Sequence, residues 1–148
     1  KGAKKAIGVE IVPEAVKCAN ELATINGLSE KISNYLGKCE DILPDIIAKE
    51  TLNKSKICVV LDPPRKGCDI KVISALIKNQ VDKIVYVSCK PSTLARDVGL
   101  LVGSLEVVNG EIKRAENYTP RYNIDLVRPF DMFANTKHVE TLVVLQRK

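Results

Sequence analysis

Residues 56–64 read Lys-Ile-Cys-Val-Val-Leu-Asp-Pro-Pro, a short apolar run that is stopped by an acid and two prolines. The run is continuous and rich in β-branched residues, which predicts a parallel strand buried on both faces. Neither proline can continue a central ladder, so the strand is expected to end at Leu61. Residues 83–87 read Lys-Ile-Val-Tyr-Val and predict a second buried strand, which ends at Ser88-Cys89-Lys90-Pro91.

Around these two strands the chain alternates between strand and helix patterns. Two further strands and four helices are predicted, the strands over residues 6–12 and 32–36 and the helices over residues 14–26, 42–51, 70–77 and 92–101. Asp69 is placed to cap the third helix. This alternation is typical of an α/β fold with a mostly parallel sheet.

The pattern changes after residue 102. Residues 104–121 are polar, charged and without periodicity, so they predict a solvated loop. Residues 124–130 and 140–145 then predict two strands joined by the loop 131–139. We expect these two strands to form an antiparallel hairpin at the edge of the sheet.

Length and composition restrict the class of protein. A chain of 148 residues forms at most one domain, and no apolar run approaches a membrane span, so we expect no membrane partner. The formal net charge of +5 suits an RNA partner without requiring one. Five cysteines without C-x-x-C spacing argue against a zinc site and against a secreted disulfide framework. We therefore expect no metal, mostly buried thiols and a cytoplasmic location, or a nuclear or mitochondrial one in a eukaryote.

Ligands in open α/β sheets bind at the carboxyl ends of the strands. Those positions hold Glu10, Asp62 and Cys89. A carboxylate such as Glu10 accepts hydrogen bonds from ribose hydroxyls in nucleotide-binding folds, but an ordinary solvated strand end has the same pattern. Asp62 is stiffened by the prolines after it, and either recognises a flat heterocycle or only caps a turn.

Cys89 is the thiol with the clearest chemical setting. Lys90 and the N-terminus of the following helix both favour the thiolate, which is the nucleophilic form. The alternative is a buried structural cysteine, and we favour that alternative for Cys18 and Cys58, which lie within a helix and a strand. Position alone does not select His138 or Glu140, because a loop histidine and a carboxylate at a strand start are usually solvated.

Four segments, in this order, resemble the uracil-5-methyltransferases that act on tRNA and rRNA. They are Gly8-Val9-Glu10 with Pro13-Glu14-Ala15-Val16, Leu61-Asp62-Pro63-Pro64-Arg65-Lys66-Gly67, Tyr86-Val87-Ser88-Cys89-Lys90-Pro91, and Asp131-Met132-Phe133-Ala134-Asn135-Thr136-Lys137-His138-Val139-Glu140-Thr141. The resemblance covers nearly the whole chain. It implies a Rossmann-like class I methyltransferase fold with S-adenosyl-L-methionine as cofactor and RNA, either tRNA or rRNA, as partner.

The resemblance also implies a role for four residues. Glu10 would hold the ribose of S-adenosyl-L-methionine, and Asp62 would lie where the cofactor meets the target base. Cys89 would be the nucleophile that adds to carbon 6 of uracil, and Glu140 the general base that removes the proton from carbon 5. The segment Gly37-Lys38-Cys39-Glu40 matches the region that approaches the adenine.

Two departures from the family pattern give further expectations. The family's first strand and glycine-rich cofactor loop would precede Lys1, so residues 1–148 are expected to be a catalytic domain truncated at its N-terminus. A sheet without a central strand exposes ladder groups, which favours self-association of the fragment. Residues 104–121 are longer than the link usual in bacterial members. Together with Arg65-Lys66-Gly67-Cys68-Asp69 they resemble eukaryotic tRNA-modifying members more, which favours tRNA over rRNA.

Three alternatives remain open from the sequence. Amino-methyltransferases also carry Asp-Pro-Pro, but they usually place an aromatic residue where Arg65 stands, and they need no cysteine. Cytosine-5-methyltransferases use a cysteine in different motif surroundings. The third alternative is a chain without activity of its own that acts as a scaffold or interaction module, because no glycine-rich loop is present.

Overall fold

The computed structural model describes residues 2–148, so Lys1, the first residue of the expected domain, lies outside the described part. The chain divides into two compact units, of which the first ends at Ile46 and the second runs from Ile47 to Lys148. In chain order the elements are β1 (Ala6–Glu10), α1 (Pro13–Ile25), β2 (Ile32–Leu36), α2 (Cys39–Leu52), β3 (Cys58–Leu61), α3 (Ile70–Lys78), β4 (Lys83–Ser88), α4 (Pro91–Val102), β5 (Leu105–Val108), β6 (Glu111–Arg114), β7 (Tyr122–Phe130) and β8 (Glu140–Arg147).

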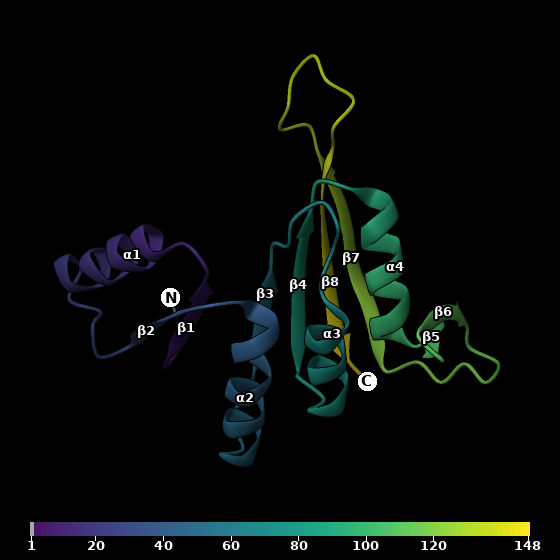
Figure 1. Ribbon diagram of the computed structural model, residues 1–148, viewed down its shortest axis with the longest axis horizontal. Helices are drawn as coiled ribbons and strands as arrows, with labels where there is room; N and C mark the ends of the chain where they lie inside the picture. The colour runs from purple at the N-terminus through teal and green to yellow at the C-terminus, as the bar shows by residue number, and fades with distance from the viewer. Residues whose placement is uncertain (1) are drawn as a thin grey trace. The chain divides into compact units, whose positions relative to one another are not determined.

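The first unit contains a strand, a helix and a second strand, followed by the start of α2 (Figure 1). β1 and β2 are parallel, and their pairing runs from Ala6 with Ile32 to Glu10 with Leu36. Pro13 occupies the first turn of α1, where its missing N–H leaves no hydrogen bond unmade. The strand is therefore shorter than predicted and ends at Glu10.

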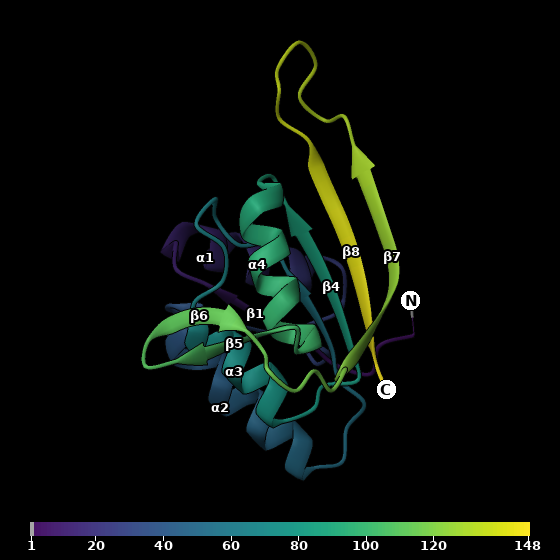
Figure 2. The same ribbon diagram turned by 90° about the vertical axis from the view of Figure 1, so that its right-hand side faces the viewer.

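The second unit is built on a four-stranded sheet in the order β3-β4-β8-β7 (Figures 1 and 2). β3 and β4 are parallel, whereas β8 is antiparallel to both β4 and β7. The C-terminal antiparallel hairpin was predicted, and β7 forms an edge of the sheet as expected. Each unit contains one parallel pair, β1-β2 in the first and β3-β4 in the second.

Helices α3 and α4 cover one face of the four-stranded sheet, as the two perpendicular views show. The core between them includes fully buried apolar side chains from helices, strands and the turn before β4, namely Leu76, Val81, Ile84, Leu101 and Leu145. The prediction that residues 56–61 are buried on both faces is wrong, because Val60 is 68% exposed. Only the side covered by helices buries the side chains of β3.

Cysteine burial also differs from the prediction. Cys18 and Cys58 were expected in the core, and both are exposed. Cys58 alternates with the buried Val59 along β3 and so points to the uncovered side. Cys18 lies off the face of α1 that contains the buried Ala23.

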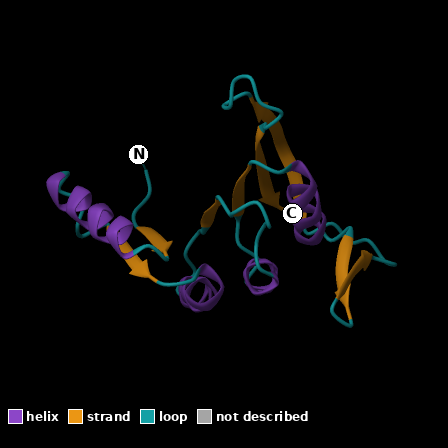
Figure 3. Ribbon diagram, turned by 45° about the horizontal axis from the view of Figure 1, so that its top comes forward, coloured by secondary structure: helices purple, strands orange, loops and turns teal. Residues whose placement is uncertain are grey.

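Residues 104–121 contain a hairpin where a loop was predicted (Figure 3). β5 and β6 pair antiparallel and are joined at Asn109 and Gly110, whose φ angles are 53° and 83°. Two successive residues with positive φ are what a type I′ hairpin turn requires, and Asn-Gly is its preferred sequence. The Asn-Gly pair was the signal that the prediction missed. Among residues 2–148, no helix has the length and apolar character needed to cross a membrane.

Candidate active site

One end of the four-stranded sheet brings two of the predicted residues onto neighbouring strands. The ladder between β4 and β8 ends where Ser88 pairs with Thr141. Cys89 directly follows Ser88, and Glu140 directly precedes Thr141, so their backbones lie one step beyond the last pair. Both residues are half-buried. A thiol and a carboxylate therefore face the same end of the sheet from adjacent strands.

Asp62 joins this end from β3. It directly follows Leu61, which pairs with Tyr86 of β4. Asp62 is therefore level with Val87, about 7 Å along the strand direction from Cys89, since a strand rises about 3.3 Å per residue. Its side chain is exposed. Three of the four predicted site residues thus lie at one end of a single sheet.

Cys89 occupies a tight connection between β4 and α4. The hydroxyl of Ser88 accepts a hydrogen bond from the backbone N–H of Lys90 at 3.1 Å and lies 3.2 Å from the Lys90 carbonyl, to which it donates. Pro91 then begins α4. These contacts fix the backbone on both sides of the thiol and place it just before the N-terminus of a helix, as predicted.

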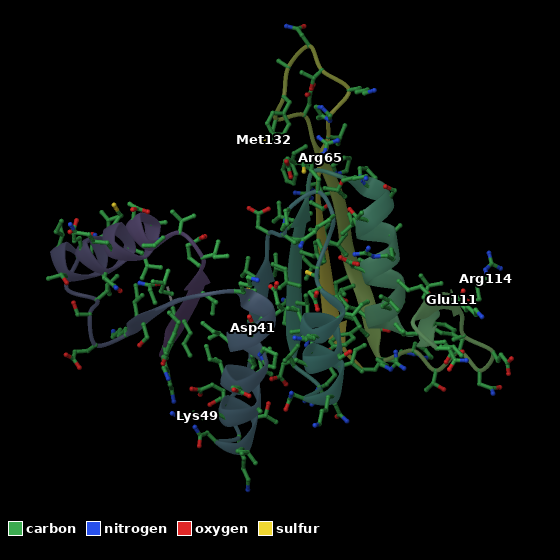
Figure 4. All side chains as sticks on the ribbon, in the orientation of Figure 1. Asp41, Lys49, Arg65, Glu111, Arg114 and Met132 are labelled. Carbon is green, nitrogen blue, oxygen red and sulfur yellow. The ribbon has the colours of Figure 1, made fainter. Side chains whose placement is uncertain are left out.

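The loop 131–139 extends beyond this same end of the sheet (Figures 1 and 2). Its base is set by the pairing of Phe130 with Glu140. Met132 in this loop and Arg65 after the Asp-Pro-Pro motif are both labelled at this end in Figure 4. Met132 is 68% exposed.

Internal contacts give the loop 131–139 a defined shape. The carbonyl of Phe133 accepts hydrogen bonds from the backbone N–H and the hydroxyl of Thr136, at 3.1 and 2.8 Å. The Thr136 hydroxyl in turn accepts from the N–H of His138 at 3.2 Å, and the Phe133 and His138 rings meet edge to face with centroids 6.4 Å apart. His138 therefore helps to shape the loop, in line with a structural rather than catalytic role.

Glu10 lies in the first unit, at the carboxyl end of β1. Its carbonyl accepts a hydrogen bond from the N–H of Gly37 at 2.9 Å, which ties the ends of β1 and β2 together. One carboxylate oxygen, Oε1, accepts from the N–H of Val12 at 2.8 Å. The side chain is exposed, so its position is fixed while its surface stays open to a ligand.

The turn after β2 completes the surroundings of Glu10. Gly37 has a φ angle of +150°, which residues with a side chain rarely adopt, and an added Cβ would lie 2.6 Å from Ile42 Cδ1, so glycine is favoured in this turn. Although Cys39 is exposed as a residue, desolvation of its thiol and the negative charges of Glu40 and Glu10 raise its pKa. This thiol stays protonated, which makes Cys39 a poor nucleophile.

Comparison with known proteins identifies the family. The sequence profile described as tRNA (Uracil-5-)-methyltransferase matches residues 41–148. The chain belongs to this family. An uncharacterized RNA methyltransferase of Listeria monocytogenes is 41% identical over 145 residues, which are 98% of this chain and 27% of the relative. A second, from Clostridium tetani, is 41% identical over 97% of this chain and 27% of its own length.

Solved structures support the fold prediction. The tRNA (uracil-54, C5)-methyltransferase of Pyrococcus abyssi, in complex with S-adenosyl-L-homocysteine, is similar with a TM-score of 0.66 and 25% identity. The match covers 95% of this chain and 28% of that one. The predicted Rossmann-like methyltransferase fold is thereby confirmed. As with the curated relatives, the chain spans little more than a quarter of the matched protein's length.

The hydrogen-bonding groups around Glu10 of this uracil-5-methyltransferase chain fit the cofactor that the resemblance implies. An exposed carboxylate at the end of a parallel strand, held by one backbone N–H, is suited to accept hydrogen bonds from ribose hydroxyls. Glu10 provides this group. Within residues 2–148, no cluster of three or more His, Cys, Asp or Glu side chains is arranged to hold a metal ion.

A buried polar cluster behind the site was missed by the sequence analysis. The fully buried carboxylate of Asp97 accepts hydrogen bonds from the Tyr86 hydroxyl at 2.5 Å and the Cys68 N–H at 2.7 Å. Burial, followed by the hydrogen bond to Asp97, raises the pKa of Tyr86 far above its usual range, so the phenol keeps its proton. The available signal was the position of Asp97, on the same helical face as Leu94 and Leu101.

Proposed function

We propose that the protein containing this chain transfers a methyl group from S-adenosyl-L-methionine to carbon 5 of a uridine in RNA. The observation that carries the proposal is the register of β4 with β8, which sets Cys89 and Glu140 on adjacent strands at one end of the sheet. A nucleophile next to a base is what carbon-5 chemistry on a pyrimidine needs. Membership of the family supports this reaction over the alternatives.

Cys89 makes carbon 5 reactive. Carbon 5 of uracil is a poor nucleophile, so the Cys89 thiolate first adds to carbon 6 and forms a C–S bond. The electron pair of the C5=C6 bond moves toward O4 as an enolate and then forms the bond from carbon 5 to the methyl group. S-adenosyl-L-methionine, when bound, would supply that methyl group as an electrophile, and its sulfonium S–CH3 bond would break to leave S-adenosyl-L-homocysteine.

Glu140 completes the reaction as general base. Its carboxylate takes the proton from carbon 5, and the electron pair of that C–H bond re-forms the C5=C6 double bond. The C–S bond breaks at the same time, and Cys89 leaves as a thiolate. The covalent intermediate thus divides one difficult substitution into easier steps.

Glu10 and Asp62 serve the cofactor in this proposal. Glu10 would hold the ribose hydroxyls with its fixed, exposed carboxylate. Asp62 would lie between the cofactor and the target base, because it directly follows β3, the strand that pairs with β4 before Cys89. The two prolines after Asp62 restrict its backbone, which limits the cost of holding the carboxylate in place.

RNA is the substrate, and tRNA is favoured over rRNA. The target uridine must leave its stack to reach Cys89. The loop 131–139 supports an RNA substrate, because the aromatic ring of Phe133 is 45% exposed on it, and aromatic side chains stack on unpaired bases. The family description and the tRNA substrate named for the Pyrococcus protein support tRNA. The exposed Val60 on the edge strand β3 supports self-association of the isolated chain.

Covalent trapping tests the proposal. The complete protein is incubated with S-adenosyl-L-methionine and RNA containing 5-fluorouridine, which has no carbon-5 proton for Glu140 to remove. We expect an adduct that survives denaturation, maps to Cys89 and is abolished by Cys89→Ala. A protein that binds RNA and transfers methyl groups without forming this adduct would instead be an amino-methyltransferase.

A further inference from the structure

Helix α4 contacts the candidate site at two places. Its first residue, Pro91, comes two positions after Cys89, so the start of the helix lies close to the nucleophile in the chain. Further along, three of its side chains reach residues 65–68, the second half of the loop that begins at Asp62. We call residues 62–68 the Asp-Pro-Pro loop. One helix thus links the thiol to the loop that bears the Asp62 carboxylate.

Arg96 and Thr93 of α4 bind the loop through its backbone carbonyls. The Arg96 Nη2 atom donates to the carbonyl of Lys66 at 3.0 Å and to that of Cys68 at 3.3 Å. The Thr93 hydroxyl lies 3.2 Å from the carbonyl of Arg65 and 3.1 Å from that of Lys90, and its single proton can be donated to either. Bonds to main-chain atoms fix the path of the loop whatever side chains it carries.

The buried Asp97 carboxylate connects α4 to β4 and to the Asp-Pro-Pro loop. Its Oδ1 atom pairs with Arg96 at 2.6 Å, and its Oδ2 atom accepts from Tyr86 of β4 and from the Cys68 N–H. Burying an ion pair brings little net stability, because desolvation of the charges offsets their attraction. A fully buried carboxylate that joins a helix, a strand and a loop is better explained by the geometry that it enforces.

Gly67 shows how closely the loop lies on these side chains. Its φ angle is +82°, and a Cβ there would lie 2.5 Å from Arg96 Nη2 and 2.6 Å from Asp97 Oδ2. The loop can contact Arg96 and Asp97 only if this position has no side chain. The turn is closed by a hydrogen bond from the Gly67 N–H to the Pro64 carbonyl at 2.8 Å.

We propose that Arg96 and Asp97 are positioning residues, which hold the Asp-Pro-Pro loop so that Asp62 stays aligned with Cys89. Neither side chain acts on the substrate. The inference rests on the proposed function, in which Asp62 lies between the cofactor and the base that Cys89 attacks. Misplacement of a positioned group by about 1 Å costs on the order of 100-fold in rate, so loss of this anchor should lower the activity of the folded molecules.

The test compares two arginine variants of the complete protein. Arg96→Gln removes the ion pair and the bonds to the loop, while Asp97 keeps Tyr86 and Cys68 as partners. The matched control is Arg147→Gln, which removes the ion pair between Arg147 Nη2 and Asp82 Oδ1 at 2.9 Å, at the other end of the same sheet. The Arg96 and Arg147 side chains are 33% and 42% exposed, so both variants are expected to fold.

We expect Arg96→Gln to raise KM for S-adenosyl-L-methionine roughly tenfold and to lower kcat/KM on the order of 100-fold. The Kd for RNA should not change, and Arg147→Gln should keep wild-type kinetics. The Tm should fall further in Arg96→Gln than in Arg147→Gln, because Asp97 is fully buried and loses its cation, so the kinetic constants are compared per folded molecule. Arg96→Lys should recover activity only in part, because an ammonium group cannot reproduce the planar fork.

The inference is overturned if Arg96→Gln keeps wild-type kinetic constants, or if its loss of activity matches its loss of folded protein. Should that variant not fold, Arg96→Lys keeps a positive charge beside Asp97, and wild-type kinetic constants in Arg96→Lys then overturn the inference. A wild-type protein without a 5-fluorouridine adduct would refute the proposed function itself. An adduct in wild type with unaltered Arg96→Gln kinetics would refute only the positioning role.

Discussion

The two ends of the four-stranded sheet are held in opposite ways. At the end opposite the site, Asp82 closes the strands directly, because its carboxylate accepts from the N–H of Ile57 at 2.8 Å and from Arg147 at 2.9 Å. Its carbonyl accepts from the N–H of Arg147 and the side chain of Gln146, both at 2.9 Å. That end is stabilised by bonds between neighbouring strands.

At the site end the side chains proposed to act on the substrate are positioned by contacts to the neighbouring backbone. Asp62 is exposed, Cys89 and Glu140 are half-buried, and the bonds that fix their surroundings come from Ser88 and from helix α4. This leaves the thiol and the carboxylates open to a substrate. The contacts that stabilise the sheet lie at one end, and the residues proposed for catalysis lie at the other. Variants at the two ends should therefore affect different measurements.

The largest expected effect is from Cys89→Ser at the site end. If Cys89 is the nucleophile, methyl transfer falls by a factor on the order of 10⁴ or more. The free energy of unfolding changes by less than about 0.5 kcal/mol, because serine has nearly the same shape at a half-buried position. Methyl transfer to RNA and urea unfolding are measured on the same preparation. Retained activity would remove the thiol from the mechanism.

Glu140→Gln is the next largest and separates the two halves of the reaction. Loss of the general base lowers kcat by roughly 10²- to 10⁴-fold. Because thiolate addition and methyl transfer precede proton removal, a covalent complex with ordinary uridine RNA should accumulate. A denaturing gel with labelled RNA detects it. Loss of activity without that complex would mean that Glu140 acts before the adduct forms.

Gly67→Ala should change both stability and catalysis, although Gly67 lies at the site end of the sheet. Strain at φ +82° and the collision with Arg96 and Asp97 should cost about 2 kcal/mol of stability. Gly110→Ala is the matched control, because its φ is +83° but nothing lies within 4 Å of the added Cβ. Only Gly67→Ala should lower kcat/KM for methyl transfer among the folded molecules. Equal effects of both variants on unfolding and on kinetics would contradict this prediction.

The sequence predicted the elements that local patterns determine. The apolar runs that end at Leu61 and Ser88 placed Asp62 and Cys89 at strand ends, because the prolines that follow cannot donate to the ladder of a central strand. The pairing of Ser88 with Thr141 had no local signal, since the two strands are far apart in sequence. The resemblance alone nominated Glu140, and tertiary structure explains why it lies next to Cys89.

Burial was the property that the sequence predicted least well. Val60 and Cys58 belong to an apolar run, yet helices cover only one face of their sheet within the second unit. Asp97 is the reverse case, a charged residue that is fully buried because Tyr86, Cys68 and Arg96 satisfy its oxygens. Neither outcome follows from hydropathy, because each depends on what packs against the position.

The smallest expected effect is a difference in alkaline stability from Tyr122, at the end opposite the site. Tyr122 is buried, its hydroxyl donates to the carbonyl of Leu76 at 3.3 Å, and burial raises its pKa to about 12. The unfolded pKa is about 10, so the folded state favours the neutral phenol. Its contribution is complete below pH of about 10 and is lost as the pH rises to about 12.

Tyr122→Phe should therefore reduce the fall in the urea midpoint between these pH values. Some decline should remain, because the pKa of Tyr86 is raised as well. An identical decline in the variant would show that Tyr122 ionises as readily in the folded protein as in the unfolded chain.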